Sequence, residues 1–360
     1  MKPFRHIYVH IPFCEVICHY CHFYTARTKE ARQPEFFAAL EKELDLWWDR
    51  LDEKLDAIYF GGGTPAASPP ALVAAFLKKL EKRVHPQTEI TLEANPTNVN
   101  PENAKIWKDA GVNRISLGVQ SLNDVLLKKL GRMHSADEAK RAAAHCLKEI
   151  SSVSGDLMYS VPEQTEQEPG EHALQLVNLG IQHISAYHLT LEPEHFLHSK
   201  LPADSFAWNQ IRGIADRLSP LGFHHYEVAS FAASGRESRN NKNYWSGGPY
   251  LALGPSAHGF DGQNSRWWNV ADWKEYIRRT DAGESPIGEK EDLTPDQRRI
   301  EVIFTSLRTS EGLELGALGA QKASLLERWR KEGLGEVTNG RFVLTFAGRM
   351  LADEIAKALL

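Results

Sequence analysis

Short apolar runs alternate with amphipathic or charged stretches along the first half of the chain. The runs contain residues that favour β structure, and the stretches between them repeat apolar residues at helical spacing. Strands are predicted at residues 6–11, 57–60, 89–94, 114–119, 156–160 and 183–189. Helices are predicted at residues 35–50, 72–83, 101–110, 137–149 and 171–179. Six successive β/α units indicate an α/β fold with a parallel sheet, arranged as a partial (β/α)6 barrel.

The end of the chain has a different pattern. Helix-like stretches are predicted at residues 295–307, 321–331 and 346–359. Between the last two, Asn339-Gly340 lies between short apolar runs, which is a strong signal for a two-residue hairpin. This order predicts a small winged-helix-like α+β domain, and the polar residues 283–292 before it predict a linker. The expected divisions are a barrel at 1–235, a connecting region at 236–292 and the winged-helix-like domain at 293–360.

Charge and composition narrow the classes of function. The net charge of −5 gives no footprint for nucleic-acid binding, and residues 295–360 hold ten Lys or Arg against nine Asp or Glu. We therefore expect the small domain to be a lid or docking module and not a DNA reader. No apolar run approaches the roughly 18 residues that cross a bilayer. Residues 1–6 lack the apolar core of a signal peptide, so a cytoplasmic location is predicted.

Three of the four cysteines lie close together after the first predicted strand. Cys14, Cys18 and Cys21 have the spacing C-x3-C-x2-C. Three such thiolates can hold three irons of a [4Fe–4S] cube, because cysteine sulfur is the usual ligand of these clusters. The fourth iron is then free to bind a small molecule. Cys146 lies in a predicted helix and is most simply a small buried apolar residue.

The same cysteines allow other interpretations. Cys18-His-Tyr-Cys21-His22 fits the C-x-x-C-H attachment motif of c-type haem, although that attachment needs an exported protein. A zinc site could use the three cysteines with His19 or His22, although no second cluster of ligands follows. Four cysteines in 360 residues are too few for a secreted fold held by disulfides.

Polar and glycine residues gather near the ends of the predicted strands. Gly61-Gly-Gly-Thr64-Pro65 follows the second strand, and glycine lets the backbone approach a ligand closely. Glu93 ends the third strand in Glu93-Ala-Asn95-Pro96, and Gln120 follows the fourth. Arg132 comes next, and Asp156 begins the fifth strand. Because barrel chemistry gathers at the carboxyl ends of the strands, we expect these residues to form one site.

Together these motifs resemble those of the oxygen-independent coproporphyrinogen III oxidases and their relatives, within the radical S-adenosylmethionine (SAM) family. The similarity is carried by Tyr8-Val-His10-Ile-Pro-Phe13-Cys14, Gly61-Gly-Gly-Thr64-Pro65, Gly118-Val-Gln120-Ser121, Leu130-Gly-Arg132-Met-His134, Gly155-Asp156-Leu-Met-Tyr-Ser-Val-Pro162 and Asn243-Tyr-Trp245. The resemblance implies a [4Fe–4S] cluster on Cys14, Cys18 and Cys21, with the amino and carboxylate groups of SAM on the open iron. It further implies a SAM site formed by Tyr8, Gly62, Gly63, Thr64, Glu93, Gln120, Arg132 and Asp156, with Tyr20 or Phe23 at the adenine.

Two features indicate the branch of this family. The true oxidases look as if they carry a fourth cysteine two residues after the third, where this chain has Phe23, and a long N-terminal extension. Here only five residues precede the first predicted strand. Both features are similar to the haem-chaperone branch, the HemW-like proteins. The resemblance implies a chaperone that binds the cluster, SAM and haem, receives electrons from a donor and delivers haem to acceptor apoproteins. The alternative is a coproporphyrinogen III oxidase (dehydrogenase) of porphyrin biosynthesis.

The haem ligand is not settled by the resemblance. The chaperone branch looks as if it carries His-Asn-x-x-Tyr-Trp, but this chain has Asn240 at the histidine position. Imidazole is a common axial ligand of haem iron, and asparagine is not comparable. His258, in a Gly/Pro-rich segment, is the candidate substitute, and His224 and His225 are weaker ones. A structural role remains the alternative for each histidine.

Overall fold

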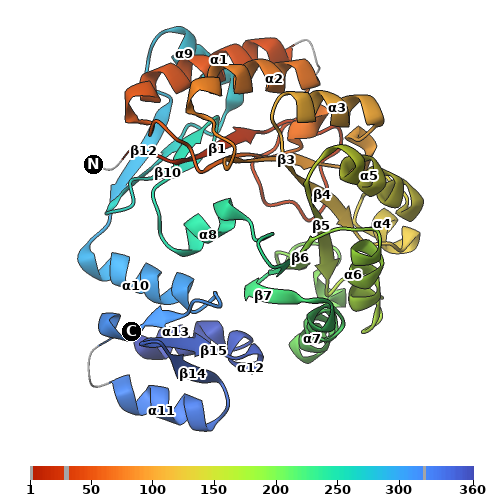
Figure 1. Ribbon diagram of the computed structural model, residues 1–360, viewed down its shortest axis with the longest axis vertical. Coiled ribbons are helices and arrows are strands. Elements are labelled where there is room, and N and C mark those ends of the chain that lie inside the picture. Colours follow the sequence, from red (N-terminus) through yellow and green to blue (C-terminus); the bar gives the residue numbers. More distant parts are fainter. Residues whose placement is uncertain (1–2, 28–31, 319–321) are drawn as a thin grey trace.

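A nine-stranded sheet forms the centre of the larger part of the molecule (Figure 1). The computed structural model describes residues 3–27, 32–318 and 322–360. Six strands of the sheet are parallel and follow one another in sequence order. They are β1 (His6–Ile11), β2 (Ala57–Gly62), β3 (Glu89–Ala94), β4 (Arg114–Gln120), β5 (Ser152–Tyr159) and β6 (His183–His188). The predicted partial (β/α)6 fold is therefore confirmed.

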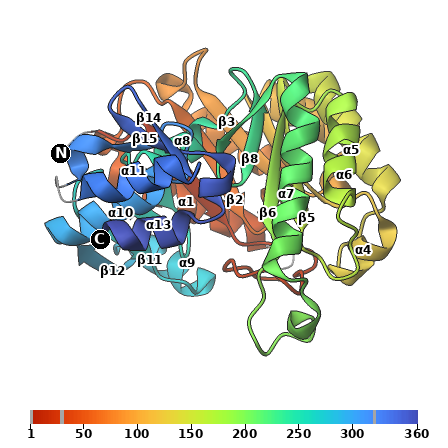
Figure 2. The same ribbon diagram turned by 90° about the horizontal axis from the view of Figure 1, so that it is seen from below.

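Helices cover the outer face of this sheet, as Figures 1 and 2 show from two directions. They are α1 (Gln33–Trp47), α2 (Pro70–Lys79), α3 (Pro101–Asp109), α4 (Asp124–Lys129), α5 (Ala136–Glu149), α6 (Glu168–Asn178) and α7 (Asp204–Leu218). Successive strand side chains point to opposite faces. Val9, Phe60 and Leu117 are fully buried in the hydrophobic core, whereas Glu93 and Asp156 line a cavity on the inner side. This alternation gives the barrel an apolar outer face and a polar interior.

Three further strands extend the sheet at both edges. β7 (Phe223–Glu227) and β8 (Ser230–Ala233) form an antiparallel pair, and β8 lies antiparallel to β6. At the opposite edge, β9 (Leu251–Leu253) pairs in parallel with β1. The segment predicted as a connecting region, residues 236–292, thus supplies one strand of the main sheet.

The same segment forms a second, three-stranded sheet of its own. Its strands are β10 (His258–Phe260), β11 (Ser265–Asn269) and β12 (Ile287–Asp292), with α8 (Arg239–Trp245) before it and α9 (Trp273–Asp281) between β11 and β12. The predicted linker at residues 283–292 is therefore wrong for β12, which pairs antiparallel with β11. Backbone pairing holds this charged sequence in a strand, because an edge strand can leave its polar side chains in solvent.

Glu43 of α1 connects several of these elements from a fully buried position. One carboxyl oxygen accepts from the backbone N–H of Gly254 at 2.8 Å and from the Tyr276 hydroxyl at 2.5 Å. The other accepts from the Asn269 side-chain amide at 2.6 Å. Burial raises the pKa of the Glu43 carboxyl to about 7. This group fixes α1 to the segment after β9, to β11 and to α9.

The C-terminal part has its own hydrophobic cluster and a three-stranded sheet in the order β13-β15-β14. Its elements are α10 (Pro295–Ser306), β13 (Leu313–Glu314), α11 (Ala323–Lys331), β14 (Gly335–Thr338), β15 (Arg341–Leu344), α12 (Phe346–Arg349) and α13 (Ala352–Leu359). Asn339 and Gly340 both have positive φ, 53° and 75°, as a two-residue turn between β14 and β15 requires. This part is the predicted winged-helix-like α+β unit, while the exact domain limits stay a prediction.

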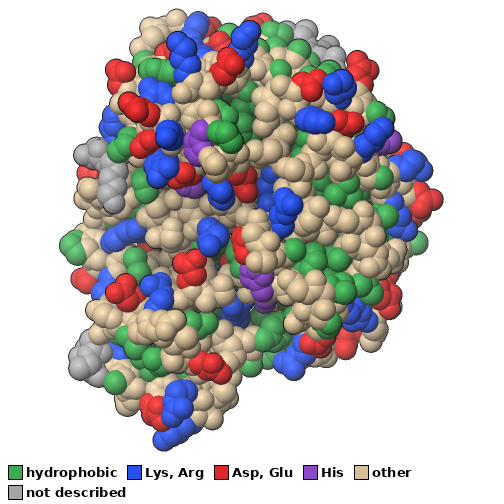
Figure 3. Space-filling view, in the orientation of Figure 1, with side chains coloured by type: hydrophobic (Ala, Val, Ile, Leu, Met, Phe, Trp, Pro, Cys, Tyr) green, Lys and Arg blue, Asp and Glu red, His purple; other side chains and the backbone are tan. Residues whose placement is uncertain are grey.

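The helices of this part differ from the prediction in detail. Residue 321, the predicted start of one helix, lies outside the described residues, and α11 begins at Ala323. The single helix predicted at 346–359 consists of α12 and α13, separated by Met350 and Leu351. On the face in Figure 3, acidic and basic side chains are interspersed over this part, at the lower left. Among the described residues, no helix combines the length and apolarity that a membrane crossing requires.

Candidate functional site

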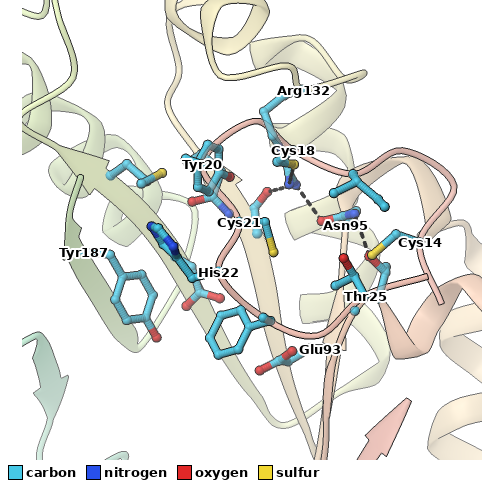
Figure 4. Close-up of a pocket in the computed structure, with 18 of the residues that line it drawn as sticks. Cys14, Cys18, Tyr20, Cys21, His22, Thr25, Glu93, Asn95, Arg132 and Tyr187 are labelled. Atoms are coloured by element: carbon cyan, nitrogen blue, oxygen red, sulfur yellow. Dashed lines mark hydrogen bonds between the residues drawn. The ribbon is translucent and has the colours of Figure 1, made fainter. Parts of the chain in front are cut away.

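A cavity of about 370 Å³ lies at the carboxyl ends of the parallel strands (Figure 4). All three predicted cluster cysteines line it. So do nine of the ten residues predicted around SAM, namely Tyr20, Phe23, Gly62, Gly63, Thr64, Glu93, Gln120, Arg132 and Asp156. The fold therefore brings together residues that are up to 142 positions apart in the sequence. We call this space the first cavity.

The cysteines lie on the loop that follows β1. The backbone N–H of Cys14 donates to the Ala26 carbonyl at 3.1 Å, which closes the base of this loop. Figure 2 shows the loop, in red, beside the green loop after β6. The two are joined by ring contact between His19 and Phe196, at 5.8 Å, and by a 3.3 Å hydrogen bond between His22 and the Thr190 carbonyl. The cysteine loop is thus held over the barrel opening.

Cys14, Cys18 and Cys21 are free, partly buried thiols. Burial raises the pKa of Cys14 to about 11 and also raises the pKa of Cys21, and the neighbouring thiols act in the same direction. A coordinated metal deprotonates such thiols outright. Cys146, by contrast, is fully buried in α5 within the core, as predicted.

The three sulfurs share a cavity without converging on one point. Among the described residues, no three His, Cys, Asp or Glu side chains are placed to hold a single metal ion. In a four-iron cube each thiolate binds a different iron. The donor set of three free cysteines in one cavity therefore fits the cube.

A chain of polar contacts connects two of the cysteines across the first cavity (Figure 4). The Asn95 amide donates to the Thr64 hydroxyl oxygen at 3.0 Å, which leaves the hydroxyl proton for the Cys14 sulfur at 3.5 Å. Arg132 donates to Asn95 at 2.5 Å and to the Cys18 sulfur at 3.3 Å. Hydroxyl and guanidinium donors both stabilise a thiolate. The sequence analysis assigns no role to Asn95. Its position directly after the end of a strand is the feature that could have predicted its place in the cavity.

Two carboxyl groups occupy the inner wall of the first cavity. Glu93 accepts from the Tyr59 hydroxyl at 2.7 Å and from the backbone N–H of Gly62 at 3.3 Å. Burial raises the pKa of Glu93 to about 7, and nearby Asp156 adds to the shift. Asp156 accepts from the Ser116 hydroxyl at 2.8 Å, and burial raises its pKa as well. Carboxyls in such a site can accept from the ammonium or hydroxyl groups of a bound ligand.

The glycine motif has a packing role in addition to its place in the cavity wall. Gly62 has a φ of +112°, and a Cβ there would lie 2.6 Å from the His10 ring. A Cβ on Gly63 would lie 2.6 Å from the Pro12 backbone, directly before the cysteine loop. The absence of side chains thus lets the end of β2 pack against the segment that carries the cysteines.

Some residues differ from the sequence-based expectations. Tyr8 is not part of the first cavity, and its hydroxyl forms a 3.1 Å hydrogen bond with His10. Tyr187 and His22 line the first cavity without having been assigned to it. Tyr187 lies near the end of β6, so the rule that found Glu93 could have found it. His22 directly follows the third cysteine.

A second cavity, of about 700 Å³, lies next to the first. Seven Phe or Tyr side chains and three histidines line it, and Tyr8 is one of these residues. His22 and Phe23, from the cysteine loop, line both cavities. The remaining lining comes from β1, the end of the cysteine loop, the segments around α8 and before β10, and from β10, β11 and α10. The second cavity therefore joins the barrel opening to the C-terminal part.

Among the histidines considered as haem ligands, His258 lines the second cavity. Its ring stacks on Trp268, with the ring centres 5.4 Å apart. His224 pairs with Glu237 at 2.6 Å. His225 stacks on Phe231 at 4.2 Å, and burial lowers its pKa to about 3. These contacts give the last two histidines structural roles.

Asn240, at the family's histidine position, is 2% exposed and is not among the residues that line either cavity. Its side-chain oxygen is buried with no hydrogen-bond partner in the described part of the chain. A haem bound in the second cavity would therefore need an iron ligand other than Asn240.

Comparison with known proteins defines the class first. Residues 8–176 match the sequence model of the Radical SAM superfamily. A solved structure of coproporphyrinogen III oxidase (HemN) from Escherichia coli, described as a radical SAM enzyme, has a TM-score of 0.83 and 21% identity. The alignment covers 99% of this chain and 90% of that one, which establishes the shared fold. Membership of this superfamily implies a [4Fe–4S] cluster and SAM.

Closer relatives define the family. The heme chaperone HemW of Mycobacterium tuberculosis is 33% identical over 100% of this chain and 95% of its own length. That of Bacillus subtilis is 30% identical over 98% of both chains. The zebrafish (Danio rerio) mitochondrial radical S-adenosyl methionine domain-containing protein 1 is 29% identical, over 98% of this chain and 86% of its own. The chain belongs to the HemW family of radical SAM proteins.

Proposed function

We propose that this protein is a haem chaperone that holds a [4Fe–4S] cluster and SAM in the first cavity and haem in the second. The observation that carries the proposal is the shared wall: His22 and Phe23 belong to both cavities and directly follow Cys21. A haem in the second cavity would then lie beside the cluster loop. The names of the HemW relatives agree with this function.

The residues of the first cavity suit the first two ligands. Cys14, Cys18 and Cys21 would hold the cluster, which supplies an electron to the sulfonium of SAM when bound. Arg132 and the glycine loop would orient the carboxylate and amino groups of SAM, and Glu93 and Asp156 offer acceptors for its ammonium and hydroxyl groups. The free thiols call for a reducing compartment such as the cytoplasm.

The second cavity suits a flat apolar macrocycle. Aromatic side chains dominate its lining, and aromatic rings pack well against planar ligands. Burial lowers the pKa of His258, which keeps the imidazole neutral as an iron ligand must be. We therefore assign His258 as the axial ligand in this proposal. Acceptor apoproteins and an electron donor for the cluster would be the partners.

Replacing His258 by alanine is expected to weaken haem binding at least about tenfold, because a metal site that loses a ligand loses affinity by this order or more. Titration of the anaerobically reconstituted protein with haemin, followed by its Soret band, measures the change. The matched control is His224→Ala, since His224 lies outside the second cavity and pairs with Glu237. Equal affinities for the wild type and His258→Ala would rule out this ligand.

The alternative activity can be tested in parallel. The wild-type protein is incubated anaerobically with coproporphyrinogen III, SAM and a reductant. A chaperone leaves the substrate unchanged and transfers bound haem to an apo-haem protein. Appearance of protoporphyrinogen would instead identify the dehydrogenase. A wild-type protein that does not alter the haemin spectrum would exclude the chaperone.

A further inference from the structure

Two arginines share one carboxylate in the wall of the second cavity. Arg266 of β11 donates to one oxygen of Glu301 at 2.6 Å, and Arg298 donates to the other oxygen at 3.2 Å. Glu301 and Arg298 lie on α10, so the group connects the C-terminal part to the second sheet. Arg298 also donates to the Gly247 carbonyl at 3.0 Å.

The arrangement leaves this wall with an excess of positive charge. Glu301 is the one carboxylate among the described residues that line the second cavity, against two guanidinium groups. His10, His22 and His258 also line it, and none of them is an acid. Each guanidinium has five N–H donors, and Glu301 accepts from a part of them. The cavity can therefore accept an anion in addition to Glu301.

The two guanidinium groups are also positioned beside an aromatic ring. Arg298 lies over Phe260 at 4.7 Å from the ring centre, and Arg266 lies over the same ring at 5.7 Å. The side chains are one quarter to one third exposed, so solvent screens them only in part. Gly247, with a φ of +66°, leaves room for Arg298, because a Cβ there would lie 2.5 Å from its guanidinium. Cations fixed next to an apolar aromatic surface suit a flat ligand with carboxylate arms.

We propose that Arg266 and Arg298 bind the carboxylate arms of a tetrapyrrole in the second cavity, and that Glu301 occupies their place in the unloaded protein. Arginine presents a planar fork of donors that matches a carboxylate, so one carboxylate can replace another with little rearrangement. Replacement of the Glu301 carboxylate by a ligand carboxylate would also explain why two arginines hold Glu301 in the wall of a cavity of this size. The inference rests on the proposed haem-binding function and specifies how that site recognises its ligand.

The test compares two iron porphyrins that differ in their carboxylates. Haemin carries two propionates, and iron(III) octaethylporphyrin carries none. Arg266→Gln and Arg298→Gln are each expected to weaken haemin binding at least about tenfold, as the loss of a hydrogen bond to a charged group predicts. Their affinity for octaethylporphyrin iron should stay within about twofold of the wild type. Arg299→Gln, an exposed arginine on the same helix outside the cavity, is the matched control.

Glu301→Gln separates ligand recognition from a merely structural role. This substitution breaks the same ion pairs while leaving both guanidinium groups in place. If the arginines bind the ligand, Glu301→Gln should bind haemin as tightly as the wild type or several-fold more tightly, because the competing carboxylate is gone. If the ion pairs only hold the cavity together, this variant should lose affinity for both porphyrins, and the inference is overturned.

The outcomes also distinguish this inference from the proposed function. A wild-type protein that binds neither porphyrin refutes the haem chaperone and, with it, the carboxylate site. A wild-type protein that binds haemin, with arginine variants that bind it equally well or that lose both porphyrins alike, refutes the carboxylate site alone. Selective loss of haemin in the arginine variants, with retention in Glu301→Gln, supports both.

Discussion

Replacing Cys14, Cys18 or Cys21 by alanine is expected to abolish the broad visible absorption of the anaerobically reconstituted protein. In a cube held by three thiolates, each cysteine binds one iron, and the remaining two cannot retain the cluster in this partly exposed loop. Iron and sulfide contents per chain should fall to near zero together with the absorption. Each measurement is made on protein reconstituted in parallel with the wild type.

Cys146→Ala is the control, since this thiol is buried in α5 and lies outside the first cavity. It should keep the full iron and sulfide content. A wild-type protein that contains one metal ion per chain and no sulfide would contradict the cluster and favour the zinc alternative. Retention of the cluster in any one of the three alanine variants would remove that cysteine from the ligand set.

The second large effect is expected from Glu43→Ala, on stability. The substitution removes the acceptor that three buried donors share, on Gly254, Asn269 and Tyr276; only the Asn269 amide has a second acceptor, the Gly254 carbonyl. An unsatisfied buried group costs about 1–3 kcal/mol, so a loss of roughly 3 kcal/mol or more is expected at pH 5. Denaturant unfolding measures it. Glu41→Ala, on the same helix but partly exposed, should change stability by less than about 1 kcal/mol.

The loss of stability in Glu43→Ala is expected to depend on pH. The folded-state pKa of Glu43, about 7, is above its ordinary value of 4.5, so the folded protein binds this proton more tightly than the unfolded chain. The contribution of Glu43 to stability therefore declines as the pH rises from about 4.5 to about 7. The stability difference between wild type and Glu43→Ala should shrink over this interval. A difference that grows with pH would contradict the raised pKa.

The sequence predicted the six parallel strands well because each has an apolar face with a period of two residues. The fifth strand was predicted too short at its start, since β5 begins at Ser152. Its first residues include Ser154, a polar side chain that faces the interior and hydrogen-bonds to Asp156. A strand whose side chains line the polar interior of the barrel has no continuous apolar run, so its first residues are not predicted as a strand. The three-residue β9 was missed for another reason, because its strand geometry comes from pairing with β1.

The candidate site divides in the same way. Cysteine spacing predicted the three thiols, and strand ends predicted most of the first cavity. The rule based on strand ends gives no assignment for Tyr8, because Tyr8 lies in the middle of β1. Which cavity its side chain lines depends on the three-dimensional fold. The second cavity was not predictable at all, since its wall combines β1, β10, β11 and α10. Arg266 and Glu301 are 35 residues apart, and no local pattern connects them.

The parallel pairing of β9 with β1 means that one edge of β1 gains its partner strand late in synthesis. Residues 7–9 of the first strand meet residues 251–253, so the outer edge of β1 has no partner until more than two thirds of the chain has been made. An unpaired strand edge is a template for wrong pairing with other chains. The cysteine loop begins three residues beyond that strand. The nascent polypeptide therefore carries the three cysteines next to an open strand edge until residues 251–253 have been made and can pair with β1.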